Sequence, residues 1–135
     1  MTLTDANILY ALIDPRQKDH ARCKSALSRL SMPMVTTCIC LTEAMYFAYK
    51  TGGWQRQNQL WKLVQDGLLE VAHLSDLEMQ KIAALMQKYQ DTPMDLADAS
   101  LVAFAESHGH STIFTLDSDF YIYKLADDET FIVVP

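Results

Sequence analysis

The sequence has few cysteines, and they do not form the pattern of a disulfide framework or a zinc site. Only three occur, Cys23, Cys38 and Cys40. An odd and sparse set argues against a disulfide-stapled secreted domain. Cys38 and Cys40 are too close together for the usual zinc knuckle, and no histidine lies at ligand spacing. We therefore expect ordinary, partly buried thiols, because a free cysteine packs as a small hydrophobic residue.

Long apolar runs are also missing. None approaches the roughly 18–20 residues that a membrane-spanning helix needs. The opening segment, MTLTDANILYALIDPR, lacks the basic leader and the cleavage site of a secretory signal. We therefore expect a cytoplasmic protein with no membrane association. The 135 residues are 50% hydrophobic and 21% charged, without repeats or low-complexity segments, so they predict a single domain over residues 1–135.

Positive charge is scarce in the second half of the chain. The net charge is −6, and residues 68–135 carry three Lys or Arg against twelve Asp or Glu. This balance speaks against a nucleic-acid partner, although bound metal ions can reverse the field locally. A basic group near the start of the chain could hold an RNA backbone or could simply be a solvated helix face. Its members are Arg16, Lys18, Arg22, Lys24 and Arg29.

Short β-like runs alternate with helical patterns along the chain. We expect strands at residues 1–5, 33–36, 68–71, 112–115 and 131–134. We expect helices at residues 7–13, 18–30, 42–49, 54–65, 75–89 and 95–108. Gly52 and Gly53 would close the third helix, and Ser75 and Glu78 would form a capping box. This alternation predicts an α/β fold, a three-layer α/β/α domain around a central, mostly parallel five-stranded sheet.

Acidic residues occupy four regions of the chain. Three regions lie at expected strand ends or helix starts, near the carboxyl edge of the sheet where a ligand would bind, and the fourth is an acid in an apolar helix. The residues are Asp5, Glu43, Asp95, Asp98, Asp117 and Asp119. Each has an ordinary alternative role. Aspartate caps helices and favours turns, a carboxylate in a first helical turn favours the helix dipole, and Glu43 could lie on a short polar stripe. The joint arrangement is harder to explain in these terms.

Carboxylates that converge need a counter-charge. They repel one another, and some would be forced to take up a proton. Glu43, on an otherwise apolar helix, would be costly to bury without a partner. Mg²⁺ and Mn²⁺ prefer oxygen ligands and relieve this repulsion. Two such ions roughly 3.5–4 Å apart can activate water and stabilise the leaving oxygen in phosphodiester cleavage.

At these residues the sequence resembles the PIN-domain family, especially the VapC-type ribonucleases of bacterial toxin–antitoxin systems. The likeness covers nearly the whole chain, in order. Asp5-Ala6-Asn7 matches the family's Asp-Thr-Asn-like start, with Ala6 in place of the usual hydroxyl residue. Glu43 matches the acid of the third helix, and DASLVAFA from Asp98 matches the third acid and its helix. TLDSDF, from Thr115 to Phe120, matches the Thr-x-Asp-x-Asp-Phe signature.

The resemblance implies a PIN-like fold and an endoribonuclease that depends on Mg²⁺ or Mn²⁺, the toxin of a type II toxin–antitoxin pair. It assigns catalysis and metal binding to Asp5, Glu43, Asp98 and Asp117. Asp95 and Asp119 are possible additional acids, and Asn7 and Thr115 would orient the carboxylates. It also implies products with 5′-phosphate and 3′-hydroxyl ends, a homodimer and a cognate antitoxin.

Two other functions stay open. Another Mg²⁺-dependent phosphoryl hydrolase could use Asp5 as a nucleophile, but it would usually carry a second acid two residues on, where this chain has Asn7. A non-catalytic module for nucleic-acid binding or protein interaction could share the fold. No histidine lies in a recognisable triad, so no catalytic histidine is expected. Trp54 and Trp61 could stack on bases, although a place in the core or a dimer interface is favoured.

Overall fold

The computed structural model describes all residues from 1 to 135. Five strands form one sheet in the order β3-β2-β1-β4-β5, and every neighbouring pair is parallel. They are β1 (Thr2–Thr4), β2 (Met34–Thr37), β3 (Leu69–Ala72), β4 (Thr112–Phe114) and β5 (Ile132–Val134). The expected five-stranded sheet is confirmed. The chain leaves β1 in one direction and returns to its other side at β4, so the strand order reverses between these two strands.

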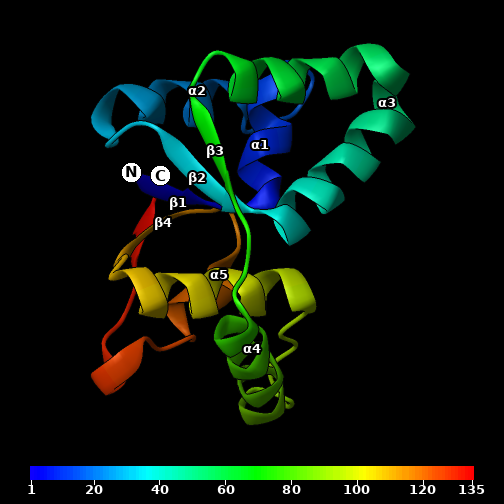
Figure 1. Ribbon diagram of the computed structural model, residues 1–135. Helices are drawn as coiled ribbons and strands as arrows, with labels where there is room; N and C mark the ends of the chain where they lie inside the picture. The colour runs from blue at the N-terminus through cyan, green and yellow to red at the C-terminus, as the bar shows by residue number, and fades with distance from the viewer.

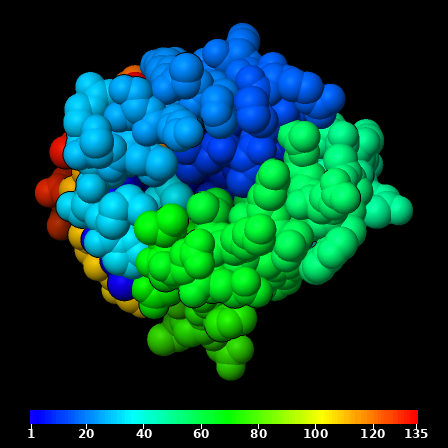
Figure 2. Space-filling model, turned by 90° about the horizontal axis from the view of Figure 1, so that it is seen from above, coloured from blue at the N-terminus to red at the C-terminus, as the bar shows by residue number.

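Helices cover both faces of the sheet, which confirms the three-layer architecture (Figure 1). On one side lie α1 (Ala6–Ile13), α2 (His20–Ala26) and α3 (Cys38–Gln65), and on the other α4 (Asp76–Lys88) and α5 (Leu96–His108). Figure 2 looks onto the side formed by α1, α2 and α3, coloured blue to green. None of these helices combines the length and the apolar character that crossing a bilayer requires.

One of the expected helix assignments is wrong, and another needs refinement. The helix expected at residues 18–30 is a shorter α2 followed by the 3₁₀ helix η1 (Leu27–Arg29). The helix expected to contain residues 42–49 and the helix expected at 54–65 are the two halves of α3, joined across a kink at Gly53. The first half begins at Cys38, because the Thr37 side chain caps it by accepting a hydrogen bond from the Cys40 amide at 3.2 Å. The helix bends at Gly53, whose φ of 62° and ψ of −153° suit glycine alone.

A single cluster of 31 buried apolar residues fills the space between the layers. The most enclosed element is α5, in which every residue from Ala97 to Ala105 is buried. Its small side chains allow it to lie between the sheet and α4. The packing brings the first turn of α5 to the carboxyl edge of the sheet. The capping box that opens α4, formed by Ser75 and Glu78, is confirmed.

Candidate active site

Asp5 follows β1 and is held rigidly at the carboxyl edge of the sheet. It caps α1, and its Oδ1 accepts a hydrogen bond from the Ala6 amide at 2.7 Å. Its Oδ2 accepts hydrogen bonds from the Thr115 hydroxyl at 2.8 Å and from the Asn7 amide group at 3.2 Å. The residue is only 5% exposed. Because Thr115 comes from the segment after β4, these bonds join the ends of two neighbouring strands.

The segment that follows β4 is fixed by the same residues. The Leu116 amide donates to Oδ1 of Asn7 at 3.2 Å, and the Asp117 amide donates to the Thr115 hydroxyl at 3.0 Å. Asp117 in turn caps the 3₁₀ helix η2 (Ser118–Tyr121), where its Oδ1 accepts from the Asp119 amide at 2.9 Å. The half-buried Asp117 is thus presented by a backbone that its neighbours hold in one conformation.

Asp98 lies in the first turn of α5 and is 8% exposed. Its Oδ2 lies 3.3 Å from the hydroxyl of Tyr123, a fully buried residue whose hydroxyl also lies 3.0 Å from the Pro93 carbonyl oxygen. Sequence reasoning missed Tyr123, because no local motif marks it. Asp95, expected as the first residue of this helix, is instead its exposed N-cap and accepts from the Asp98 amide at 2.8 Å.

Glu43 projects from α3 and is half-buried, so its burial is weaker than the apolar sequence around it suggested. It lines a cleft of about 640 Å³ together with Asp95. It also lines a cavity of about 220 Å³ together with Asn7 and Leu116. Glu43 therefore stands between the N-terminus of α5 and the ends of β1 and β4.

The acidic side chains influence one another electrostatically. Burial raises the pKa of Asp5 to about 6, against the lowering effect of its hydrogen bonds, and the charges of Glu43 and Asp117 raise it further. Burial and then the charges of Asp95, Asp5 and Asp117 raise the pKa of Asp98 to about 8. Partial burial and the charge of Asp95 raise the pKa of Glu43. The four acids assigned by the resemblance thus lie within electrostatic range of one another.

The chemistry of these donors fits a hard divalent cation. All of them are carboxylate oxygens, which Mg²⁺ and Mn²⁺ prefer. In the orientations described, no group of three or more His, Cys, Asp or Glu side chains is arranged to hold a metal ion. Carboxylates without a cation between them repel one another.

The remaining candidate residues lie on the surface or in the core. Trp54 and Trp61 are exposed on α3, so of the two favoured places, the core and a dimer interface, the core is excluded. The three cysteines are free, as expected, with Cys23 and Cys40 buried and Cys38 exposed. All five residues of the basic group are exposed.

Comparisons with known proteins agree on one family. A family model described as PIN domain matches residues 2–125. Ribonuclease VapC26 of Mycobacterium tuberculosis is 26% identical over 115 residues, which cover 85% of each chain. No comparison of this kind assigns a role to a residue of this chain.

Solved structures share the fold. The crystal structure of VapC20 from Mycobacterium tuberculosis, described as a sarcin-ricin loop cleaving toxin, superposes with a TM-score of 0.81 at 14% identity, covering 88% of this chain and 92% of that one. A toxin–antitoxin complex from Klebsiella pneumoniae gives a TM-score of 0.71 at 23% identity, covering 100% of this chain and 97% of that one. At such identities the likeness shows that the fold is shared, and evidence about function comes from the residues of the site.

Proposed function

Because this chain belongs to the PIN-domain family, we propose that it is a divalent-metal-dependent endoribonuclease and the toxin of a type II toxin–antitoxin pair. The relationship to a VapC ribonuclease over most of the chain supports the activity. The observation that supports the proposal is the electrostatic influence of acids from separate elements on the buried Asp5 and Asp98, near the carboxyl edge of the sheet. The acids of the proposed site are Asp5, Glu43, Asp98 and Asp117. In this proposal residues 1–135 form one catalytic domain.

Each side chain has a role in the proposed reaction. Asp5, Asp98 and Asp117 would hold Mg²⁺ or Mn²⁺ directly, and Glu43 would complete the site directly or through water. The bound ions would supply the activation of water and the neutralisation of the phosphodiester charge. Asn7 and Thr115 hold Asp5 in position through the bonds described above. Cleavage leaves 5′-phosphate and 3′-hydroxyl ends on RNA.

Asp95 and Asp119 act beside the site in this proposal. The Asp95 side chain caps α5 by accepting a hydrogen bond from the Asp98 amide. The Asp119 amide donates a hydrogen bond to the side chain of Asp117. Both contribute negative charge at the same edge of the sheet, where a cation is favoured.

The proposal extends to partners and location. A homodimer is supported by large apolar side chains that α3 exposes, among them Tyr46, Tyr49, Trp54 and Trp61. A cognate antitoxin is supported by the Klebsiella pneumoniae complex, in which a chain of the same fold is part of a toxin–antitoxin assembly. The cytoplasm is supported by the three free thiols, which suit a reducing compartment.

Cleavage of labelled single-stranded RNA in Mg²⁺ or Mn²⁺, with EDTA as the metal-free control, tests the proposal. The Asp98→Asn variant should lose activity by at least about 100-fold, a barrier increase of about 2.7 kcal/mol. Asp128→Asn makes the same chemical change at an exposed turn and should leave activity unchanged. Equal cleavage by the wild type and Asp98→Asn, or cleavage that survives EDTA, would contradict the assignment.

The same assay separates the two other functions. A non-catalytic module would bind RNA without cutting it under any metal condition. A phosphatase with Asp5 as its nucleophile would accumulate an acid-stable aspartyl phosphate. The structure disfavours that role, because both carboxylate oxygens of Asp5 accept hydrogen bonds and the residue is buried.

A further inference from the structure

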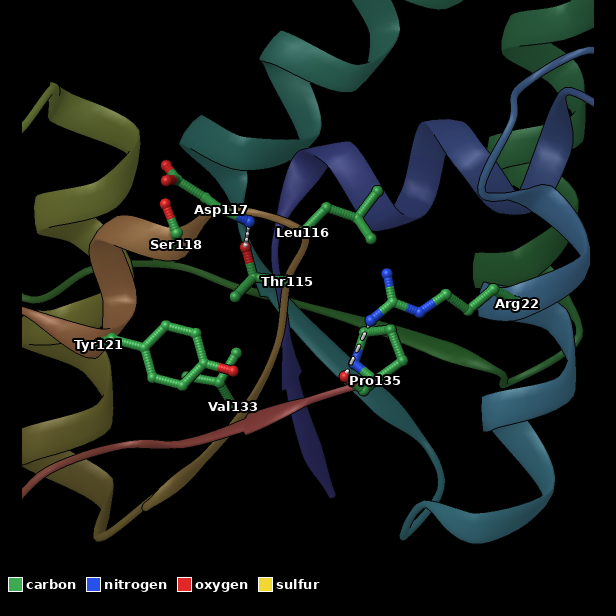
Figure 3. Close-up of a pocket in the computed structure, with 8 residues that line it drawn as sticks. All are labelled: Arg22, Thr115, Leu116, Asp117, Ser118, Tyr121, Val133 and Pro135. Carbon is green, nitrogen blue, oxygen red and sulfur yellow. Dashed lines mark hydrogen bonds between the residues drawn. The ribbon is translucent and has the colours of Figure 1, made fainter.

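Three hollows follow one another along the carboxyl edge of the sheet. The cleft of about 640 Å³ and the cavity of about 220 Å³ share Glu43. That cavity shares Leu116 with a third pocket of about 120 Å³, which is shown in Figure 3. We call this series of hollows the edge groove. It runs past the acidic residues and ends beside α2 and β5.

The edge groove is acidic along most of its length. The acidic residues among its lining are Asp19, Glu43, Asp95 and Asp117. Arg22, in the third pocket, is the only Lys or Arg that lines any of the three hollows. An RNA strand carries one negative charge per nucleotide, and carboxylates repel it wherever no cation intervenes. Beyond the proposed metal ions, Arg22 is therefore the one side chain in the groove that can neutralise a phosphate.

The walls of the third pocket suit a phosphate group. In Figure 3 the Arg22 guanidinium reaches in from α2, the Tyr121 ring forms the opposite wall over Val133, and the Asp117 carboxylate points away. Arg22 donates to a main-chain carboxylate oxygen of Pro135 at 3.4 Å and lies 3.9 Å from Asp19, both long contacts. Its side chain is 61% exposed, so several guanidinium N–H donors remain free for a ligand.

Thr115 connects this pocket to the acidic site. It lines the pocket and donates its hydroxyl proton to Asp5. Only the Thr115–Asp117 segment, fixed by its own hydrogen bonds, separates the two. A strand whose scissile phosphate lies over the acids would therefore bring a neighbouring nucleotide to Arg22.

We propose that the third pocket binds the backbone phosphate of a nucleotide flanking the scissile bond, with Arg22 as the phosphate ligand and Tyr121 stacking on the adjoining base. Arginine binds phosphate through paired N–H donors. The Tyr121 ring is exposed at the wall of the pocket, so a base next to the bound phosphate can stack on it. This inference rests on the proposed function, since it assigns part of the same substrate.

The test measures binding of a fluorescein-labelled, ten-nucleotide single-stranded RNA of mixed sequence between 50 and 200 mM KCl. Asp98→Asn in Mg²⁺ serves as the background that prevents cleavage. Adding Arg22→Ala should weaken binding about tenfold at the lowest salt, because charged hydrogen bonds are lost. It should also reduce the slope of log K against log salt by about 0.7, the value for one phosphate contact on a single strand.

Two further variants make the result specific. Arg29→Ala removes the same charge from an exposed position in η1 that lines none of the hollows, and it should leave the slope unchanged. Tyr121→Ala should weaken binding about fivefold or more without altering the slope, because stacking carries no charge. Equal slopes for Arg22→Ala and Arg29→Ala would overturn the proposal.

Cleavage kinetics in the otherwise wild-type chain test the proposed nuclease function and the phosphate pocket separately. They also test the pocket if the Asp98→Asn background binds RNA too weakly to measure. Arg22→Ala should raise KM about tenfold with kcat nearly unchanged, as expected for lost binding away from the reacting atoms. A wild-type chain that cuts no RNA would refute the proposed function. A wild-type chain that cuts RNA while Arg22→Ala has an unchanged KM would refute only the phosphate pocket.

Discussion

The hydroxyl oxygen of Tyr123 lies 3.3 Å from Oδ2 of Asp98, and the two residues are both buried. Burial, followed by the charge of Asp98, holds the pKa of Tyr123 well above its usual range, so the hydroxyl remains a donor. Its single hydrogen is shared with the Pro93 carbonyl oxygen at 3.0 Å. This hydrogen bond therefore links the orientation of the Asp98 carboxylate, on α5, to the position of Tyr123 in the segment after η2.

The Tyr123→Phe variant should bind Mn²⁺ about tenfold more weakly, because it removes the group that orients Asp98. The ring and its packing remain, so the free energy of unfolding should fall by only about 1 kcal/mol. Isothermal titration with Mn²⁺ and urea denaturation measure the two effects. Tyr89→Phe removes the hydroxyl of a neighbouring ring that accepts only from the Lys124 amide. If both variants bound Mn²⁺ as the wild type does, the orienting role would be refuted.

The metal-free protein should become less stable as pH rises from about 4 to 8. Both Asp5 and Asp98 ordinarily ionise near pH 3.8, but the fold raises their pKa values to about 6 and about 8. Over this range the folded state holds more protons than the unfolded state, so the free energy of unfolding decreases with pH. The limit is about 1.4 kcal/mol per pH unit for each group.

Urea denaturation in EDTA from pH 4.5 to 8.5 measures this dependence, and the difference between wild type and Asp98→Asn isolates the contribution of Asp98. The variant should lose the decline between about pH 6 and 8 and keep the part that Asp5 causes below about pH 6. Parallel profiles for the two proteins would show that Asp98 does not retain its proton in the folded state.

Asp14 at the end of α1 should stabilise the bend of α3 through Arg56. Its Oδ1 lies 2.7 Å from Nη1 of Arg56 and 3.2 Å from Nε of Arg16. Burial alone would raise the pKa of Asp14, but hydrogen bonds from Arg16 and Arg56 hold it well below its usual range. Asp14→Asn should therefore cost about 2 kcal/mol at pH 7, between the values for exposed and buried ion pairs.

Thermal or urea unfolding checks this value, and Asp19→Asn is the control. The Asp19–Arg22 contact is longer, at 3.9 Å, and Arg22 is exposed, so its loss should cost less than about 1 kcal/mol. Because the folded pKa of Asp14 is depressed, its contribution should be present above about pH 4 and disappear as pH falls below it. Equal losses for the two variants at pH 7 would contradict the expectation.

Gly53→Ala should destabilise the fold more than Gly109→Ala does. An added methyl group meets no neighbouring atom at either position, so the difference between the variants reflects the backbone alone. Gly109 has a left-handed helical conformation that costs alanine about 1 kcal/mol. Gly53, with φ 62° and ψ −153°, lies in a region open almost only to glycine, where the cost is about 1–3 kcal/mol. Urea denaturation of both variants measures the free energy of unfolding. A smaller loss for Gly53→Ala than for Gly109→Ala would contradict the view that the bend requires a conformation open only to glycine.

Much of the fold could be predicted because its causes are local. Apolar runs such as the one from Ile113 to Phe114 are buried strands, and the Ser75–Glu78 pair opens α4 as its spacing predicts. The break of α3 at its glycine pair was predicted, but the start of the helix at Cys38 was not. That start depends on the Thr37 cap, and the geometry of the bend depends on the conformation of Gly53.

The sequence by itself determined the alternation of strands and helices, and with it a parallel sheet whose carboxyl edge carries Asp5 and Asp117. Hydrophobic periodicity and capping act over a few residues, so they can be read directly from the chain. Only the tertiary structure decided which groups surround those acids. The hydrogen bond from Tyr123 to Asp98, and the pocket that Arg22 lines together with Thr115 and Tyr121, join residues far apart in the chain. Such contacts are set by packing across layers, which no local pattern encodes.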